Sequence, residues 1–334
     1  MLITDYSSLY NNTIKGTFLD AAADRVEKDV GMRLFDVRDS RQRTITKQVV
    51  HGQSGVGFVA EGSDLPNATG QDGDDISATQ QYYGTNVIVT KHMRTFSLES
   101  TDGEGGPEVS AIEDIVNTIT DDAFDKIDQS FADVLLFGFS TSYTNVYGRT
   151  ETAVTPDGLS LFSAAHTQLT ESFSNLCVDA DGNTNAALSR ESVIATRNAA
   201  LGYTDANGIL RPIELDLLIV GPGLVDLADR IIDSEKIQGS ANNDKNKTTS
   251  LKGVEVLKWN RLAVDGQGTA KGNYWFMANK AKLKNTLKAW FAQKPMILPA
   301  KEGETNANWY YPLDYFYTIM RFQPQYLRGS TGAG

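Results

Sequence analysis

The chain contains 334 residues, of which 40% are hydrophobic and 22% are charged, as expected for a folded globular protein of about two domains. Its formal net charge of −11 argues against a nucleic-acid-binding protein, because such proteins use lysine and arginine to displace the counterions of phosphate. There is no membrane span and no secretory signal pattern, and a lone cysteine, Cys177, cannot form an internal disulfide. The sequence therefore predicts a cytosolic, acidic, disulfide-free protein.

The first predicted helix covers residues 17–30 and is followed by Gly31, which is expected to end it. Apolar side chains recur at every fourth position and form a stripe along this helix: Phe18, Ala22, Val26 and Val30. Residues 1–16 are polar and show no hydrophobic period. They are expected to form an arm that needs a neighbouring surface to hold it.

Between residues 38 and 98 the hydrophobic period changes to two. Residues 44–50 and 85–90 are rich in β-branched side chains and are predicted to be strands. The segment between them has many glycines and few large apolar residues, which indicates turns and close backbone approach. Because a two-stranded ribbon alone is marginal in water, we expect this segment to project from the body and pack on another chain.

Residues 107–137 predict a very long amphipathic helix, roughly 45 Å at 1.5 Å per residue. Pro107 and Glu108 suit its first turn, and Gly138 follows its last. Apolar side chains recur at spacings of three or four: Ile112, Val116, Ile119, Ala123, Ile127, Phe131 and Val134. The other face is acidic and is interpreted as solvated: Glu113, Asp114, Asp121, Asp122, Asp125 and Asp128.

Residues 139–188 are rich in loop formers, and residues 189–280 predict a compact α/β unit with its own sheet. Its predicted helices are 189–201, capped by Ser189, and 224–232, and its predicted strands are 215–220, 254–259 and 274–278. The aromatic run 309–322 is predicted to be core or interface.

A local basic strip follows the α/β unit: Lys280, Lys282, Lys284 and Lys288. One interpretation is a solvated helix or strand edge. The other is a partner for the acidic surface of a neighbouring subunit.

Residues 157–166 bring Asp157, Ser163 and His166 into one short stretch, the residue types of a hydrolytic triad. Such groups are usually far apart in sequence, and the strained G-x-S-x-G turn that exposes a nucleophile is absent from the sequence. We therefore favour a structural role for this stretch. A serine hydrolase that uses Ser163 and His166 is kept as an alternative.

Other segments resemble calcium, phosphate or metal-binding motifs, but their residues do not match the required spacing. Residues 179–185 begin like a calcium loop, but Thr184 replaces the required glycine and Arg190 stands where a bidentate glutamate belongs. Glycine-rich residues 52–57 and 266–272 do not match a phosphate loop. His51, His92, His166 and Cys177 have no second metal ligand at a suitable spacing. The sequence predicts no catalytic residue, no cofactor and no metal site.

The order of these elements resembles the major capsid protein of tailed double-stranded-DNA bacteriophages, the Hong Kong ninety-seven fold. Three local sequences are similar to that family. Residues 82–91 (YYGTNVIVTK) resemble the strand returning from its extended loop, and residues 157–166 (DGLSLFSAAH) resemble a signature of Mu-like head subunits. Residues 217–224 (LLIVGPGL) resemble the strand-to-helix turn of its axial domain.

The resemblance implies an α+β fold with five parts. These are an N-terminal arm and first helix (1–37), an extended β loop (38–98), a peripheral domain (99–188) with a spine helix (107–137), an axial domain (189–280), and a return to the peripheral domain with a C-terminal tail (281–334).

The resemblance also implies a non-enzymatic structural subunit. It would self-assemble into pentamers and hexamers of an icosahedral virion shell, formed in the host cytoplasm around DNA that it does not bind sequence-specifically. Portal and decoration proteins would be further partners. Because the chain starts at Met1 and enters the arm at once, we expect no cleaved extension and a separate scaffolding protein. Lys47 lies in the ribbon, but no asparagine partner beside an acid is evident, so no covalent cross-link is predicted.

Two alternatives to a virus head stay open besides the hydrolase. A bacterial encapsulin-like compartment would enclose cargo enzymes in a shell of the same fold. A tail or fibre protein is disfavoured, because such proteins are usually β-rich repeats, whereas this sequence predicts a long helix and a single α/β unit.

Overall fold

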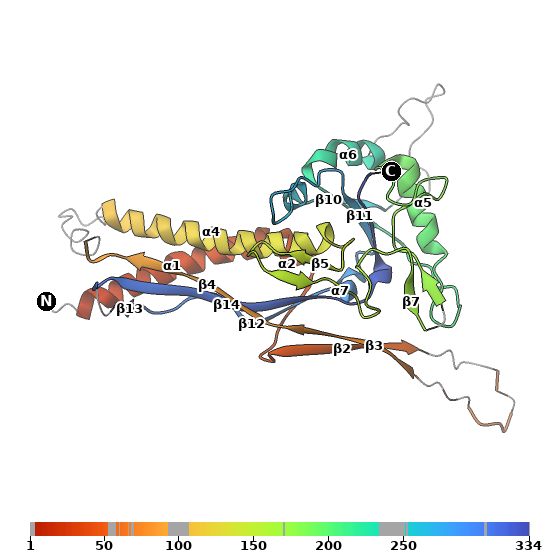
Figure 1. Cartoon of the computed structure of the whole chain (residues 1–334), viewed down its shortest axis with the longest axis horizontal. Helices are drawn as coiled ribbons and strands as arrows, with labels where there is room; N and C mark the ends of the chain where they lie inside the picture. Colours follow the sequence, from red (N-terminus) through yellow and green to blue (C-terminus); the bar gives the residue numbers. More distant parts are fainter. Residues whose placement is uncertain are drawn as a thin grey trace.

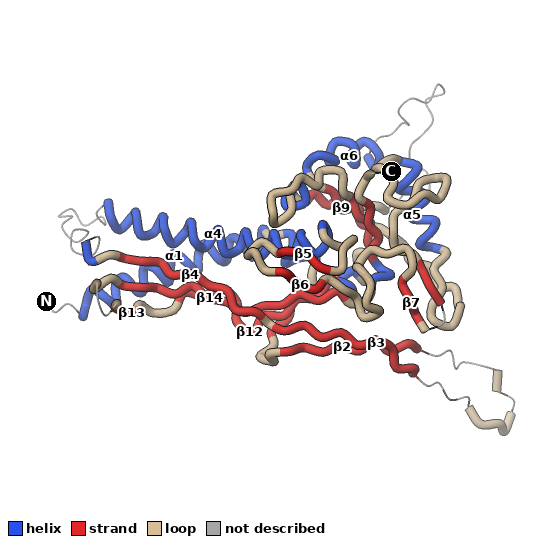
Figure 2. The backbone as a smooth tube through the Cα atoms, viewed as in Figure 1, coloured by secondary structure: helices blue, strands red, loops and turns tan. Residues whose placement is uncertain are grey.

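The computed structural model describes residues 4–52, 58–59, 61–65, 67, 70–92, 107–169, 171–233, 251, 253–303 and 306–333. An elongated limb of helices over a sheet carries an α/β unit at one end, and a two-stranded ribbon runs beneath both (Figure 1). Figure 2 shows α4 above the strands of the limb, whereas α1 overlaps them in this view. None of the described helices is both long enough and apolar enough to cross a bilayer.

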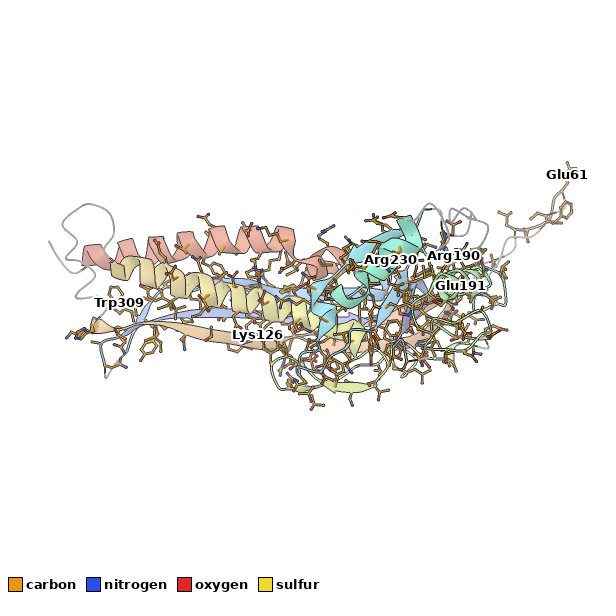
Figure 3. The ribbon with its side chains drawn as sticks, turned by 90° about the horizontal axis from the view of Figure 1, so that it is seen from above. Glu61, Lys126, Arg190, Glu191, Arg230 and Trp309 are labelled. Atoms are coloured by element: carbon orange, nitrogen blue, oxygen red, sulfur yellow. The ribbon has the colours of Figure 1, made fainter. Side chains whose placement is uncertain are left out.

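Two long helices form the upper layer of the limb. Helix α4 (Pro107–Leu136) has 30 residues, and the predicted long helix is confirmed. Helix α1 (Thr4–Lys28) packs along α4, as Figures 1 and 3 show. Val116, Ile127 and Phe131 of α4 are buried in the main core, as the apolar stripe predicted.

The prediction for the N-terminal segment was wrong in its boundaries. Helix α1 begins at Thr4 and not at residue 17, because the apolar stripe continues one turn earlier through Ile14, which is buried in the main core. The helix is interrupted at Asp29, which has an extended backbone, and helix α2 (Val30–Leu34) follows. Residues 4–16, expected to be a polar arm, are therefore helical.

Gly31 lies inside α2 and does not end a helix. A Cβ atom at this position would lie 2.5 Å from Cδ2 and 2.8 Å from Cβ of Phe131 on α4. The Gly31 N–H donates to Oδ1 of Asp128 at 2.9 Å. The glycine is thus required by the close approach of α2 to α4.

The limb sheet consists of β1 (Asp36–Asp39), β12 (Leu287–Ile297), β14 (Trp309–Arg321), β4 (Gln81–Val89) and the short β13 (Lys301–Glu302). Strand β1 runs parallel to β12, whereas β12 and β4 flank β14 in antiparallel fashion. Buried tyrosines of β14 pack toward α4, where the Tyr317 hydroxyl donates to Oγ of Ser130 at 2.9 Å. The aromatic run is therefore core, as predicted.

The α/β unit has a four-stranded sheet in the order β10 (Glu255–Lys258), β9 (Leu217–Val220), β11 (Trp275–Ala278) and β15 (Leu327–Ser330). Its helices are α5 (Arg190–Leu201), η1 (Pro222–Leu224) and α6 (Val225–Asp233). The predicted Ser189 cap is confirmed, since its side chain accepts from Ser192 N–H. The fourth strand, β15, comes from beyond residue 280, where the sequence predicted a return to the limb.

Short elements connect these parts: β5 (Ser142–Thr144) with β6 (Thr150–Thr152), β7 (His166–Gln168) with β8 (Glu171–Phe173), η2 (Asn260–Ala263), α7 (Leu283–Thr286) and η3 (Pro324–Tyr326). Asp128 of α4 joins the two bodies, because its Oδ2 accepts from Nε1 of Trp259 at 3.1 Å. Arg25 of α1 and Arg261 of η2 both pair with Asp125 of α4. The limb and the α/β unit therefore meet at a joint in which Asp128 and Trp259 are buried and the ion pairs of Asp125 are partly exposed.

We predict that Gly31→Ala destabilises the unassembled chain by about 1–3 kcal/mol, because the added methyl group must displace the Phe131 ring. Gly16→Ala in α1 is the matched control. No atom lies within 4 Å of its added Cβ, so it should stabilise by about 0.5–1 kcal/mol through helix propensity. Urea unfolding measures both, and equal effects of the two substitutions would contradict the packing argument.

Candidate functional site

The ribbon is the part of the described structure whose side chains pack least against the rest of the chain. Strand β2 (Thr44–Gly52) pairs with β3 (Gly70–Thr79) in antiparallel register, with an irregularity between Gln48 and Val50. The predicted strand 44–50 is confirmed as β2, but its partner β3 begins in the glycine-rich segment, where the sequence predicted turns and no strand. Residues 85–90 were also predicted to be a strand, and they form most of β4, which lies in the limb sheet and not in the ribbon.

The root of the ribbon is firmly attached to the limb. Ile45 is buried against Trp290 and Met320 of the sheet. Gln80, between β3 and β4, is also buried, and its side-chain amide donates to the carbonyl oxygens of Ser40 at 2.7 Å and Gln42 at 2.9 Å. Because a buried amide and its acceptors are costly to separate, the ribbon leaves the body in a defined direction.

Beyond its root the ribbon buries little. Phe58 is 97% exposed and Leu65 is 80% exposed, and Val50 is also largely exposed. Figure 3 shows Glu61 at the far end of this segment, well beyond the body of the molecule. Large apolar side chains exposed at the end of a projecting arm are typical of a contact surface for another chain.

A cavity of about 460 Å³ separates the ribbon from the α/β unit. Val50, His51 and Asp74 line it from the ribbon. The opposite wall mixes aromatic side chains, among them Phe173, Tyr203 and Tyr326, with polar and charged ones such as Asp205 and Arg211. The outer ribbon therefore lies alongside the α/β unit without packing against it.

The residues of the proposed hydrolytic triad are only partly brought together. His166 is fully buried, with Nδ1 2.7 Å from Oδ2 of Asp157 and Nε2 3.1 Å from the carbonyl oxygen of Leu161. Thr155 and the Thr167 N–H also donate to Asp157. Burial by itself raises the pKa of Asp157, but its hydrogen bonds from His166 and Thr155 outweigh burial and lower the pKa to about 2.

Ser163 does not complete this constellation. Its N–H donates to the side-chain oxygen of Asn175 at 2.8 Å, and its hydroxyl accepts from the Ala165 N–H. The ring nitrogen that would have to activate Ser163 is instead directed at Leu161. The Asp157 and His166 pair therefore acts as an internal brace of residues 155–167, and the arrangement does not support nucleophilic catalysis by Ser163.

The remaining candidate residues take part in the fold of the chain and do not form a chemical site. Asp179 closes a turn by accepting from the backbone of Asp181 and Asn183. Cys177 is buried, which raises the pKa of its thiol to about 12. Within the described part of the chain, no group of three His, Cys, Asp or Glu side chains is placed to hold a metal.

Most of the predicted lysine strip is paired within the chain. Lys280 pairs with Glu255, and Lys288 lies 3.3 Å from Asp36. The Lys282 ammonium lies 5.1 Å from the centre of the Tyr326 ring. The strip therefore serves the fold of its own subunit, which favours the simpler of its two interpretations.

Residues at the ribbon root escaped the sequence analysis. Gln80, Trp290 and Met320 come from three distant segments, and no local period marks them. The signal that was present is the apolar residues at the root of the ribbon, Ile45 on β2 with Ile76 and Ala78 on β3. The burial of Ile45 identifies where the ribbon meets the limb.

Neither a protein-family model nor a curated protein matches the sequence. Solved structures do. A phage-related protein from Bordetella bronchiseptica RB50 has a TM-score of 0.52 at 11% identity, covering 95% of this chain and 96% of that one. The capsid of a native GTA particle has a TM-score of 0.50 at 11% identity, covering 89% and 88%.

At such identity the likeness establishes the fold. The chain has the α+β capsid fold of the Hong Kong ninety-seven type, over nearly its whole length. The fold class expected from the order of elements is confirmed.

We predict that Asp157→Asn lowers the free energy of unfolding at pH 7 by about 2 kcal/mol, since a carboxyl group whose pKa falls from 3.8 to about 2 stabilises the folded state when ionised. This contribution is present above about pH 4 and is lost as the pH falls toward 2. Unfolding by urea at a series of pH values measures the difference between variant and wild type. Asp226→Asn, at an exposed position of α6, controls for the change of charge, and a difference that persists unchanged to the lowest pH would contradict the assignment.

Proposed function

We propose that this chain is the major structural subunit of an icosahedral virus head, and that copies of it assemble into pentamers and hexamers around double-stranded DNA. The observation that carries the proposal is the ribbon. It projects from a subunit of capsid fold and ends in exposed apolar side chains that its own chain does not cover. A second subunit would supply the missing burial.

In this proposal the limb with α4 is the peripheral domain, residues 38–80 with β2 and β3 are the extended loop, and the α/β unit is the axial domain at the five-fold and six-fold centres. Repeated head-to-tail contacts between copies would close into rings. The net charge of −11 suits a shell that encloses DNA without adhering to it. The scaffolding, portal and decoration proteins would be separate partners.

An encapsulin-like compartment is the alternative within the same fold. Electron microscopy of the purified protein, alone and with other head proteins, tests assembly, and the content of the particles separates the two functions. Closed shells with double-stranded DNA in infected cells support a virus head. Shells filled with enzyme and free of DNA support the compartment, and a protein that stays monomeric under all conditions refutes both.

We predict that Phe58→Ser combined with Leu65→Ser reduces shell formation at least tenfold while leaving the unfolding of the unassembled chain unchanged. The reason is that both side chains are exposed in the isolated subunit and so contribute little to its own stability. Counting particles by electron microscopy at matched protein concentration measures the loss.

Glu61→Ser is the matched control, because it changes an exposed residue of the same segment without removing apolar surface. It should assemble like the wild type. Equal assembly by the double variant would show that the end of the ribbon is not a contact surface.

A further inference from the structure

The limb sheet ends at β4, and among the described residues no strand lies beyond it. Strand β4 pairs with β14 along its whole length, from Gln81 opposite Tyr317 to Val89 opposite Trp309, without a bulge. Seen from above, α1 borders one side of the limb and β4 the other (Figure 3). In an antiparallel pair, alternate residues direct their backbone N–H and C=O groups away from the partner strand, so β4 presents such groups along the margin of the limb.

The middle of β4 is open to solvent. Gly84, Thr85 and Asn86 are exposed in succession, although successive side chains of a strand point to opposite faces of the sheet. Ile88 is 46% exposed. Tyr83 is less accessible, because its ring stacks on Tyr147 with 4.1 Å between ring centres, whereas Tyr82 is 59% exposed. Beyond Tyr83 the edge runs from Gly84 to Val89, and in this stretch the side chains of Val87 and Val89 are buried in the main core.

This edge lacks the usual protection against pairing. Residues 81–89 (QYYGTNVIV) contain no charged residue and no proline. Strand β1, at the opposite end of the same sheet, carries Asp36, Arg38 and Asp39. Since soluble proteins normally blunt edge strands with charges, prolines or bulges, an uncharged and regular edge is suited to receiving another strand.

The chemistry of the edge selects its own copy as the partner. Two β4 strands can approach without charge repulsion, because neither carries a charged side chain, although the chain as a whole has a net charge of −11. Thr85 and Ile88 are β-branched and exposed, which favours cross-strand packing with a second copy, while Val87 and Val89 are buried in the main core and hold the strand in place. Pairing of identical edges in antiparallel orientation is symmetric and needs one surface only.

We propose that two subunits join through Gly84–Val89 of β4, which forms an antiparallel pair across a two-fold axis and continues the limb sheet from one subunit into the next. The inference rests on the proposed function only in taking a second copy as the partner. A two-fold contact joins subunits in pairs and does not by itself close a shell.

Cysteine cross-linking tests the contact in the full-length protein. Thr85→Cys, Asn86→Cys and Ile88→Cys are made singly and treated with a short bismaleimide. Native Cys177 is buried and its thiol pKa is raised, so it contributes no background. Cross-linked dimers on denaturing gels are expected from at least one strand variant, whereas Asp226→Cys on exposed α6 should give none.

Charge substitution provides a second, independent readout. Asn86→Lys and Asn86→Asp each place like charges near the two-fold axis, so each alone should reduce cross-linking through an Ile88→Cys background at least fivefold. Mixing the lysine and aspartate chains should restore it, because opposite charges then face each other. Unchanged melting of both variants confirms that the subunit itself is intact.

The outcomes separate this contact from the function. Shells that form while β4 stays unlinked overturn the contact and leave the virus-head proposal standing. Dimers linked through β4 in a protein that never forms shells support the contact and overturn the virus-head proposal. Mapped peptides that join β4 to a segment other than β4 also overturn the two-fold pairing.

Discussion

Helix α4 holds the molecule together, because three separate parts of the chain pack against it. Its Phe131 ring stacks on Phe35, at the end of α2, with 4.5 Å between ring centres. Its Ser130 hydroxyl accepts from Tyr317 of the limb sheet, and its Asp128 carboxylate accepts from both Gly31 and Trp259. A single helix therefore sets the positions of the N-terminal helices, the sheet and the α/β unit.

This arrangement explains why the body of the subunit is self-sufficient and the ribbon is not. The main core extends from the limb into the α/β unit through Ile219 and Phe276, and the α/β unit has a second core of its own. Charged side chains of α1, α4 and η2 also pair where the two bodies meet. The ribbon has only the small cluster of Ile45, Trp290 and Met320 at its root. A rigid body with one firmly aimed and mostly unburied arm is well suited to repeated contacts of one kind.

The two exposed features of the subunit differ in chemistry, and we assign them different kinds of contact. The end of the ribbon presents isolated large apolar groups, which suit insertion into a neighbour's surface. The edge of β4 presents backbone hydrogen-bonding groups and β-branched side chains, which suit continuation of a sheet. In the proposed shell, the first would join subunits around a ring and the second would join them in pairs.

Local patterns were reliable where a single periodic segment or one short motif decided the structure. The long helix appeared where its apolar stripe placed it, and the Ser189 cap formed as its residue type predicted. Asp157 and His166 also met, nine positions apart in one short irregular segment. Ser163 did not join them, since its orientation depends on Asn175, which a local motif cannot reveal.

The sequence by itself determined the long helix, strand β2 and most elements of the α/β unit, because hydrophobic period and turn residues act over a few neighbours along the chain. The tertiary structure decided what each ambiguous residue does. Gly31 resembled a helix stop, but it is required because the Phe131 ring leaves no room for a side chain at this position. Residues 4–16 are helical and belong to α1, which packs along α4, although they lack a strong hydrophobic period of their own. Strand β15 joined a sheet whose other strands lie more than 45 residues earlier. Such choices depend on surfaces that exist only once distant segments have packed, and no local pattern encodes them.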